Sequence, residues 1–306
     1  MPCVTRYNGF MKLFVHPQTD SQINALIKHP KRTVLLFGPE GVGKFTVARE
    51  IARRLTCAGC ENGSCSACVL AAVGSSPNII LVEPDAKNTI GVQAVHQLHH
   101  TLNYRPYGDN QRRIAIIHNA DSLSLPAQNA LLKLLEEPPV DTLLILTAID
   151  RTALLDTVVS RCRLLYVPPL SVKAIEGFLL EQYGIDQQAA RHAATLSHGA
   201  VGKAIRLVRD VDQLQHAQQI QQTAQGLVEG QLFDRLQVAA TLATAPQQIP
   251  ECLSALADLA HFQARHADRL LPEPLEAIQK LQQRLKAHIA PRVALEAYVL
   301  EAGVST

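Results

Sequence analysis

Near the start of the chain, seven consecutive residues have the types and spacing of a phosphate-binding loop: Gly38-Pro39-Glu40-Gly41-Val42-Gly43-Lys44. A short apolar run at 34–37 precedes them and a helical pattern at 47–55 follows, as a strand–loop–helix unit requires. In such a loop the glycines let backbone N–H groups face phosphate oxygens, and the lysine reaches the β and γ phosphates. The pattern therefore predicts a nucleotide site, in preference to a glycine-rich turn with an incidental lysine.

The position after this loop departs from the pattern of nucleotide hydrolases. A serine or threonine hydroxyl normally holds Mg²⁺ there, but this chain has Phe45, which carries no oxygen. Thr46 lies about 100° further round the helix, so we expect it not to replace the missing ligand. Binding of ATP or ADP stays open, Mg²⁺-dependent hydrolysis is doubtful, and the candidate residues here are Gly38, Pro39, Gly41, Val42, Gly43, Lys44, Phe45 and Thr46.

A second departure follows the apolar run at 114–117, which ends in His118-Asn119-Ala120-Asp121. A hydrolysing phosphate-loop protein needs an acidic residue at this kind of strand end to organise Mg²⁺. His118 has the chemistry of a metal ligand or a base, but a strand-end residue without catalytic duty is the favoured interpretation. We expect Asp121 to cap the following turn or helix. Both departures predict a nucleotide pocket that has lost its chemistry.

Four of the seven cysteines follow the helix after the loop with the spacing C-x2-C-x4-C-x2-C: Cys57, Cys60, Cys65 and Cys68. Four thiolates surround one tetrahedral Zn²⁺, and each CxxC pair supplies two sulfurs from one tight turn. Two disulfides are the alternative, which a cytosolic setting disfavours. A redox CxxC lacks its expected sequence context. The spacing predicts a structural zinc knuckle at 57–68 with no open catalytic position.

The composition limits the classes of function. The chain has 306 residues, of which 47% are hydrophobic and 18% charged, so it is globular rather than disordered. A net charge of +2 argues against binding nucleic acid through its overall field, and 4% aromatics without tryptophan argue against a base-stacking platform. Neither a membrane span nor a signal peptide is apparent, so we expect a cytoplasmic protein without membrane contact.

The elements that must position these residues change character along the chain. Short apolar runs alternating with helical patterns predict an α/β domain with a parallel sheet covered by helices on both faces. Beyond residue 168 only helical periodicity remains. We expect an α/β domain at 1–168, a small helical lid at 169–210 and an all-helical domain at 211–306. The expected strands are 34–37, 78–82, 114–117, 143–146 and 163–167, and the expected helices are 47–55, 90–102, 127–136, 154–159, 172–183, 187–197, 201–209, 211–229, 232–243, 249–267, 273–286 and 291–302.

Two more strings complete a recognisable order of motifs. Residues 128–139 read QNALLKLLEEPP, and residues 160–162 read Ser-Arg-Cys. Phosphate loop, four-cysteine knuckle, apolar strand ending near Ala-Asp, QNALLKLLEEPP and Ser-Arg-Cys together resemble the bacterial sliding-clamp loaders, the AAA+ subunits of the DNA polymerase III holoenzyme. The resemblance covers about residues 20 to 210. The degraded nucleotide site is similar to the delta-prime type of subunit, and the gamma/tau type, an ATPase motor, is the runner-up.

The resemblance implies a role without polymerase activity and without an independent ATPase. Arg161 would be an arginine finger acting in trans on a neighbour's ATP site, and Lys203 would belong to the second sensor. The implied partners are the gamma/tau and delta subunits, the sliding clamp, and primer–template DNA through the assembled complex. The helical segment 211–306 would be an oligomerisation collar. An unrelated phosphate-loop NTPase is the remaining alternative.

Overall fold

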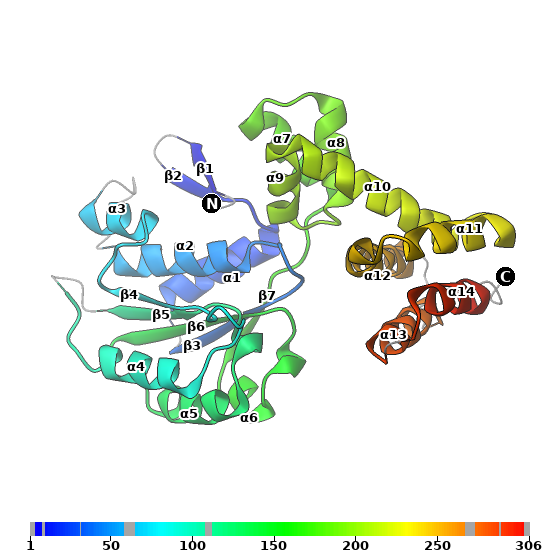
Figure 1. The fold of residues 1–306 in the computed structure, drawn as a ribbon. Helices are drawn as coiled ribbons and strands as arrows, with labels where there is room; N and C mark the ends of the chain where they lie inside the picture. Colours follow the sequence, from blue (N-terminus) through cyan, green and yellow to red (C-terminus); the bar gives the residue numbers. More distant parts are fainter. Residues whose placement is uncertain are drawn as a thin grey trace. The chain divides into compact units, whose positions relative to one another are not determined.

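The computed structural model describes residues 4–7, 10–30, 32–57, 65–107, 112–266, 273–287 and 289–302. The chain divides into two compact units, Met1–Ile205 and Arg206–Thr306, called unit 1 and unit 2 below (Figure 1). Within the described residues, no helix is long and apolar enough to span a membrane.

Unit 1 is built on a five-stranded parallel sheet with the strand order β4-β5-β6-β3-β7. These strands are β3 (Thr33–Phe37), β4 (Ile79–Val82), β5 (Arg113–Ile117), β6 (Thr142–Ala148) and β7 (Arg163–Tyr166). On one face lie α1 and α2, and on the other lie α4, α5 and α6 (Figure 1). The helices are α1 (Pro17–Lys28), α2 (Lys44–Thr56), α3 (Ser66–Ala72), α4 (Val92–Leu102), α5 (Leu125–Glu136) and α6 (Asp156–Val159), with short 3₁₀ turns η1 (Ala120–Ser122) and η2 (Arg151–Ala153).

The central strands of the sheet are buried on both faces, because β3, β5 and β6 each contain a continuous apolar run rather than an alternating pattern. In β5, Ile114 and Ile116 pack with the α1–α2 side, whereas Ala115 and Ile117 pack with the α4–α5 side. All four are at most 1% exposed. Continuous apolar runs are what a parallel sheet between two helical layers requires. The α/β architecture expected from the sequence is confirmed.

Besides the short 3₁₀ turns, four elements of unit 1 have no counterpart in the sequence expectations. They are the antiparallel strands β1 (Val4–Tyr7) and β2 (Phe10–Leu13), helix α1, and helix α3, which begins after Cys65 and contains Cys68. Helix α1 buries only Thr19, Ile23 and Leu26, so its apolar stripe is narrow. Its start is nevertheless well specified, because a proline occupies the first turn and the His16 ring accepts a hydrogen bond from the N–H of Gln18.

The carboxyl-terminal part of unit 1 is helical, and its helices begin and end at clear capping residues. They are α7 (Val172–Tyr183), α8 (Gln187–Leu196) and the start of α9 (Val201–Arg209). Ser171 and Asp186 accept hydrogen bonds from the third residue of α7 and α8, at 3.2 and 2.9 Å. Gly184 ends α7 in the left-handed conformation, which glycine adopts without strain.

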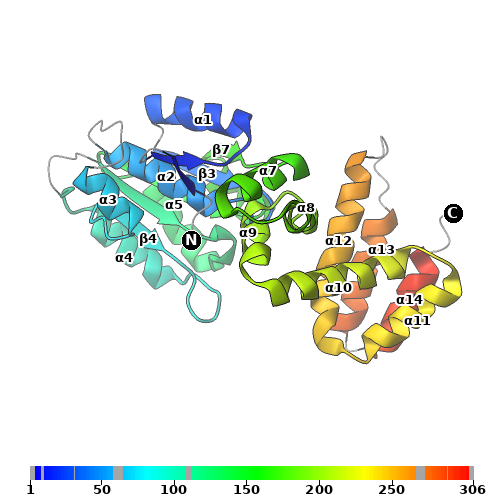
Figure 2. The same cartoon turned by 90° about the horizontal axis from the view of Figure 1, so that it is seen from above.

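Unit 2 is an all-helical bundle, as the sequence predicts. It contains α10 (Val211–Val228), α11 (Leu232–Ala243), η3 (Pro246–Gln248), α12 (Ile249–His266), α13 (Glu273–Lys286) and α14 (Pro291–Ala302). Helix α11 packs on α14 and α10 on α12 (Figure 2). Arg235 is buried in this bundle, where its Nε and Nη2 donate to the carbonyl oxygens of Leu227 and Val299 at 2.8 and 3.1 Å.

We predict that replacing Gly38 by alanine destabilises unit 1. Gly38 has φ +151°, and a β-carbon there would lie 2.3 Å from the carbonyl oxygen of Val167, which is backbone at the end of β7. In chemical denaturation, Gly38→Ala should lower the free energy of unfolding by about 1–3 kcal/mol, the usual cost of overpacking. Gly177→Ala in α7 is the matched control, because nothing lies within 4 Å of its β-carbon. Equal stability of the two variants would contradict this account.

Candidate functional site

The candidate site lies where three neighbouring strands end. In the parallel register, Phe37 of β3 is opposite Ala148 of β6, and Ile117 of β5 is opposite Leu146 of β6. The phosphate loop follows β3, His118 follows β5, and Thr147 is near the end of β6. Ligands of open α/β sheets bind at this carboxyl edge.

The phosphate loop keeps the backbone shape that the sequence predicts. Gly41 and Gly43 have φ values of +76° and +96°, which residues with a β-carbon rarely adopt. Helix α2 begins at Lys44 directly after the loop. The first-turn N–H groups of a helix have no acceptor within it, so this end of α2 is suited to an anion.

The ammonium of Lys44 is bound inside its own loop. Its Nζ donates to the carbonyl oxygens of Gly38 and Pro39 at 2.7 and 2.8 Å, and the residue is buried. Burial lowers the pKa of Lys44 to about 8, although the carboxylates of Asp121 and Glu40 act in the opposite direction. The charge that would meet a phosphate therefore already has two oxygen partners from the chain itself.

Phe45 and His118, the two residues that depart from the hydrolase pattern, are in contact. The rings of Phe45 and His118 lie 4.4 Å apart between centroids, and the guanidinium of Arg49 lies 5.9 Å from the Phe45 ring. On its other side, His118 Nδ1 is 3.1 Å from the hydroxyl of Thr147, which also accepts the N–H of Asn119 at 3.0 Å. Burial lowers the pKa of His118, so the imidazole is neutral at pH 7. Mg²⁺ takes oxygen ligands, and this pair of rings does not fit it.

Asp121 is also engaged in the fold. Its two carboxylate oxygens accept the N–H of Ile149 at 2.9 and 3.0 Å. We expected Asp121 to cap the following turn or helix, and that expectation is wrong about the partner, which lies after β6. The reason is the sheet order: β5 and β6 are neighbours, so the turn after one strand meets the turn after the other.

The start of α9 lies directly on the phosphate loop. The N–H of Gly202 donates to the carbonyl oxygen of Gly41 at 2.9 Å, and a β-carbon on Gly41 would lie 3.2 Å from that of Ala200. Lys203 follows in the same turn, with its backbone nitrogen 3.6 Å from that β-carbon position. Unit 1 therefore places the backbone of Lys203 next to the phosphate loop.

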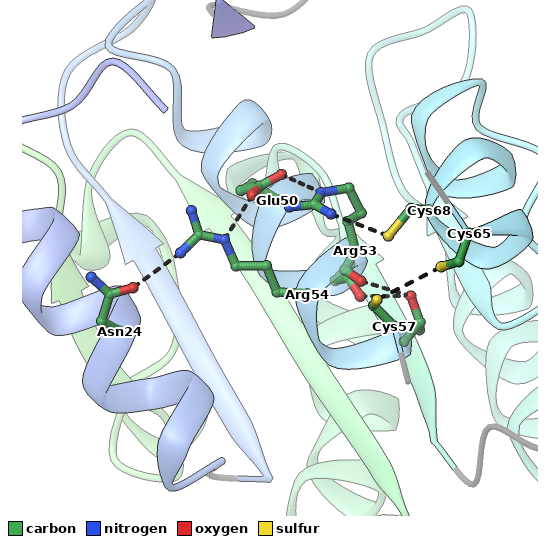
Figure 3. Close-up of polar contacts among 9 residues, drawn as sticks. Asn24, Glu50, Arg53, Arg54, Cys57, Cys65 and Cys68 are labelled. Atoms are coloured by element: carbon green, nitrogen blue, oxygen red, sulfur yellow. Dashed lines mark hydrogen bonds and ion pairs between the residues drawn. The ribbon is translucent and has the colours of Figure 1, made fainter. Parts of the chain in front are cut away.

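Three of the four knuckle cysteines form a cluster beside α2 (Figure 3). The sulfurs of Cys57, Cys65 and Cys68 lie within 4.8 Å of one another, and Cys57 and Cys65 are 3.7 Å apart. Cys60 lies outside the described residues. A tetrahedral site with Zn–S bonds of about 2.3 Å separates its sulfurs by about 3.8 Å. The donor set therefore fits a zinc ion, and these three thiols form no disulfide.

Arg161 lies where the parallel strands begin, at the edge of the sheet opposite the one that carries the phosphate loop. It precedes β7, whose first residue Arg163 pairs with Val34 near the start of β3. The five residues of β3 separate this edge from the phosphate loop, a distance of about 16 Å at 3.3 Å per residue. The exposed guanidinium donates to the carbonyl oxygen of Thr157 at 3.0 Å and forms an ion pair with Glu136 at 2.6 Å.

Cys162 follows Arg161 and is partly buried against the sheet. Its Sγ donates to the carbonyl oxygen of Val158 at 3.2 Å. Burial raises the pKa of this thiol to about 12. The side chain therefore behaves as a small packing residue.

Known proteins similar to this chain decide its family. The family model described as "DNA polymerase III, delta subunit" matches residues 18–171. The DNA polymerase III subunit delta′ of Pseudomonas aeruginosa is 30% identical over 239 residues, which are 75% of this chain and 70% of that protein. The delta′ subunit of Bacillus subtilis is 34% identical over 184 residues, 58% of this chain and 53% of that protein.

The chain belongs to the DNA polymerase III delta-prime family. The match spans about half the length of the Bacillus relative. The alternative of an unrelated phosphate-loop NTPase is therefore wrong.

Two further matches concern the fold and the runner-up. The gamma/tau subunit of Mycobacterium tuberculosis (strain H37Rv) is 34% identical over 160 residues, 49% of this chain and 27% of that protein. The structure of the RuvB Holliday junction branch migration motor of Thermotoga maritima has a TM-score of 0.50 at 17% identity, covering 75% of this chain and 82% of that one. The sheet and helices thus have the AAA+ phosphate-loop fold.

Several contacts at these sites could not have been found in the sequence. Thr147 lies inside an apolar strand, and nothing in its surroundings marks it as the partner of His118. Glu136 belongs to QNALLKLLEEPP, but its pairing with Arg161 joins residues 25 apart in the chain. The clustering of Phe45 with His118 could have been suspected, because both replace groups that meet at one Mg²⁺ ion in hydrolases.

We predict that Mg²⁺ does not strengthen nucleotide binding by this chain. Titration calorimetry of ATP into the wild type should show no binding, or binding equal with and without Mg²⁺, because Phe45 and His118 supply no metal oxygen. The double variant Phe45→Thr with His118→Asp restores two oxygen ligands and should make ATP binding Mg²⁺-dependent.

Thr46→Ala is the control for this experiment. Thr46 lies beside Phe45 but on another side of the helix, so its loss should leave the Mg²⁺ response of the wild type unchanged. Clear Mg²⁺-dependent binding by the wild type, lost in Thr46→Ala, would show that Thr46 holds the metal and would contradict the prediction.

Proposed function

We propose that this chain is a delta-prime-type subunit of the bacterial sliding-clamp loader, acting in DNA replication in the cytoplasm. Its role is that of a ring member which supplies Arg161 to the ATP site of a neighbouring subunit and has no ATPase of its own. The observation that carries the proposal is the position of Arg161 at the edge of the sheet opposite the phosphate loop. From that edge the guanidinium is remote from its own loop and open to another chain.

The chemistry of a guanidinium suits this role. Phosphoryl transfer develops negative charge on the transferred oxygens, and an arginine placed there in trans accelerates the reaction by about 10³ to 10⁵. Arg161 is held by Glu136 in an exposed ion pair, with 37% and 52% of the two side chains accessible. Such pairs contribute little stability, so a nucleotide phosphate can compete with Glu136 for the guanidinium.

The chain's own loop supports a static role. Lys44 is bound to loop carbonyls, Phe45 packs on His118, and Gly202 is hydrogen-bonded to Gly41. A motor of the gamma/tau type would need metal ligands at the positions of Phe45 and His118, so we favour delta-prime over that alternative. We propose ATP or ADP binding at Gly38–Thr46 and Lys203 only as a metal-independent event.

The remaining assignments belong to the same proposal. Zinc is bound at Cys57, Cys60, Cys65 and Cys68 and is structural. The chain is organised as 1–168, 169–210 and 211–306, with the last segment as the oligomerisation collar. Its partners are the gamma/tau and delta subunits, the sliding clamp, and primer–template DNA contacted by the assembled complex.

We expect Arg161→Ala to slow ATP turnover by the assembled clamp loader. In a reconstituted complex whose other ATP sites have been inactivated, turnover at the site served by Arg161 should fall by about 10³-fold or more, the lower end of arginine-finger effects. The matched control is Arg151→Ala, which removes another exposed arginine from unit 1.

Folding is checked separately, because loss of the Glu136 ion pair should not unfold the chain. Arg161→Ala should keep the wild-type circular dichroism spectrum and assemble normally. Unchanged turnover in a fully assembled mutant complex would rule out the arginine finger.

We expect the purified chain to contain one zinc ion. Four thiolate ligands in one knuckle form a closed structural site, so metal analysis should give one Zn per chain. In a thiol titration of the denatured chain, the sample with a chelator should react at four more thiols than the sample that retains its zinc. Zinc near zero in protein whose thiols are all reduced would refute the knuckle.

A further inference from the structure

A buried carboxylate on α2 is the centre of a polar network beside the cysteine cluster. Glu50 is 3% exposed and accepts both forks of Arg53, with Nε to Oε2 and Nη2 to Oε1 at 2.7 Å each. Arg54 donates its Nε to Oε1 at 2.7 Å. Two parallel N–H bonds between Arg53 and Glu50 fix the plane of the guanidinium as well as its position.

The third nitrogen of the fixed Arg53 guanidinium, Nη1, faces a sulfur. Arg53 Nη1 donates to Cys68 Sγ at 3.2 Å, and Cys68 is 1% exposed. Figure 3 shows Arg53 between Glu50 on one side and Cys68 on the other. Arg53 therefore contacts a residue of the cysteine cluster while Glu50 determines its orientation.

Two other arginines of α2 bind the helices that flank it, α1 and α3. Arg54 donates its Nη1 to the Asn24 side chain of α1 at 3.0 Å. Arg49 donates to the carbonyl oxygens of Ala71 and Ala72 at the end of α3, at 3.1 and 2.8 Å. These arginines of α2 thus have different partners, and the partner of Arg53 is a sulfur.

The charge of a zinc–thiolate site explains what Arg53 would do there. Four thiolates around Zn²⁺ carry a net charge of about −2, and burying that charge is costly without nearby donors or cations. A guanidinium that donates to a metal-bound sulfur offsets part of this charge and holds the sulfur in place. Glu50 alone would have the opposite effect, but its charge is neutralised by two arginines.

We infer that Arg53, oriented by Glu50, is a positioning residue of the zinc knuckle that holds the Cys68 thiolate and slows loss of the metal. The inference rests on the zinc site proposed above and adds two residues of α2 to it. Because α2 begins at the phosphate loop, the helix that carries Lys44 at one end carries the support of the knuckle at the other.

The test compares zinc release from the full-length wild type and the variants Arg53→Ala, Arg53→Lys and Glu50→Gln. Each chain is loaded with Zn²⁺ alone, and release to a chromogenic chelator is followed in time. We expect Arg53→Ala to release zinc about 10–100-fold faster, the usual effect of losing a partner of a metal ligand. Arg53→Lys keeps the charge but not the fork, so it should release faster than the wild type, as should Glu50→Gln.

Arg54→Ala is the matched control. It also removes a guanidinium from Glu50 and α2, but it touches no sulfur among the described contacts. A general loosening of α2 would speed release in Arg54→Ala as much as in the Arg53 variants, and that result would overturn the inference. If Arg53→Ala does not fold, the comparison of Arg53→Lys with Arg54→Ala decides.

The absorption spectrum of the Co²⁺-loaded chain distinguishes loss of the Arg53 hydrogen bond from a general loosening of α2. In the Co²⁺-loaded chain, loss of an N–H donor to a bound thiolate should shift the sulfur-to-cobalt charge-transfer band in Arg53→Lys and leave it in place in Arg54→Ala. An identical band in all variants would overturn the inference. A wild type that binds neither Zn²⁺ nor Co²⁺ would instead refute the proposed zinc site, on which the inference depends.

Discussion

The parallel register of β5, β6 and β3 is the constraint on which the other features depend. Because helical crossovers connect the strands, the strands run in one direction and all end at one edge. That arrangement brings together the phosphate loop, His118 and Thr147, which come from three separate parts of the sequence. It also sends the chain segment before β7, with Arg161, to the other edge. One geometric rule thus separates a nucleotide-like pocket from an exposed guanidinium in the same unit.

Helix α2 carries two buried charges, and each is accommodated in a different way. Within the part of the chain that the structure describes, the ammonium of Lys44 donates to two carbonyl oxygens, and its burial lowers its pKa to about 8. Glu50 has two guanidinium groups, so its charge is paired as well as hydrogen-bonded. Burial of an ion is tolerated where partners of opposite charge surround it. Towards the knuckle, α2 is therefore stabilised by ion pairs. At the phosphate loop, α2 is stabilised by the hydrogen bonds of Lys44, and the loop is stabilised by its contact with the start of α9.

The sequence was sufficient for the elements whose patterns are strong. The apolar runs of the sheet and the helices α7, α11 and α14 lie where periodicity predicts them, because burial of one face requires apolar residues at regular positions. The hairpin of β1 and β2 was missed because its strands, VTRY and FMKL, lack the continuous apolar run of the equally short β4. Helix α3 was missed because seven residues are too few to show a helical period. At the site, residue types predicted the loop, but contacts such as Thr147 with His118 or Arg161 with Glu136 depend on which strands and helices are neighbours. A single sequence does not contain that information in local form.

The buried Arg235 of unit 2 has a consequence for how the bundle is made. Its two carbonyl partners belong to α10 and α14, and Val299 lies 64 residues beyond the arginine. During synthesis on the ribosome, Arg235 is released long before Val299 exists, so its guanidinium has to stay hydrated through that interval. A buried donor left without an acceptor costs about 1–3 kcal/mol, which opposes premature closure of α10, α11 and α12 around it. Helix α14, the last described helix, thus completes the hydrogen bonding of a residue buried among the helices made before it.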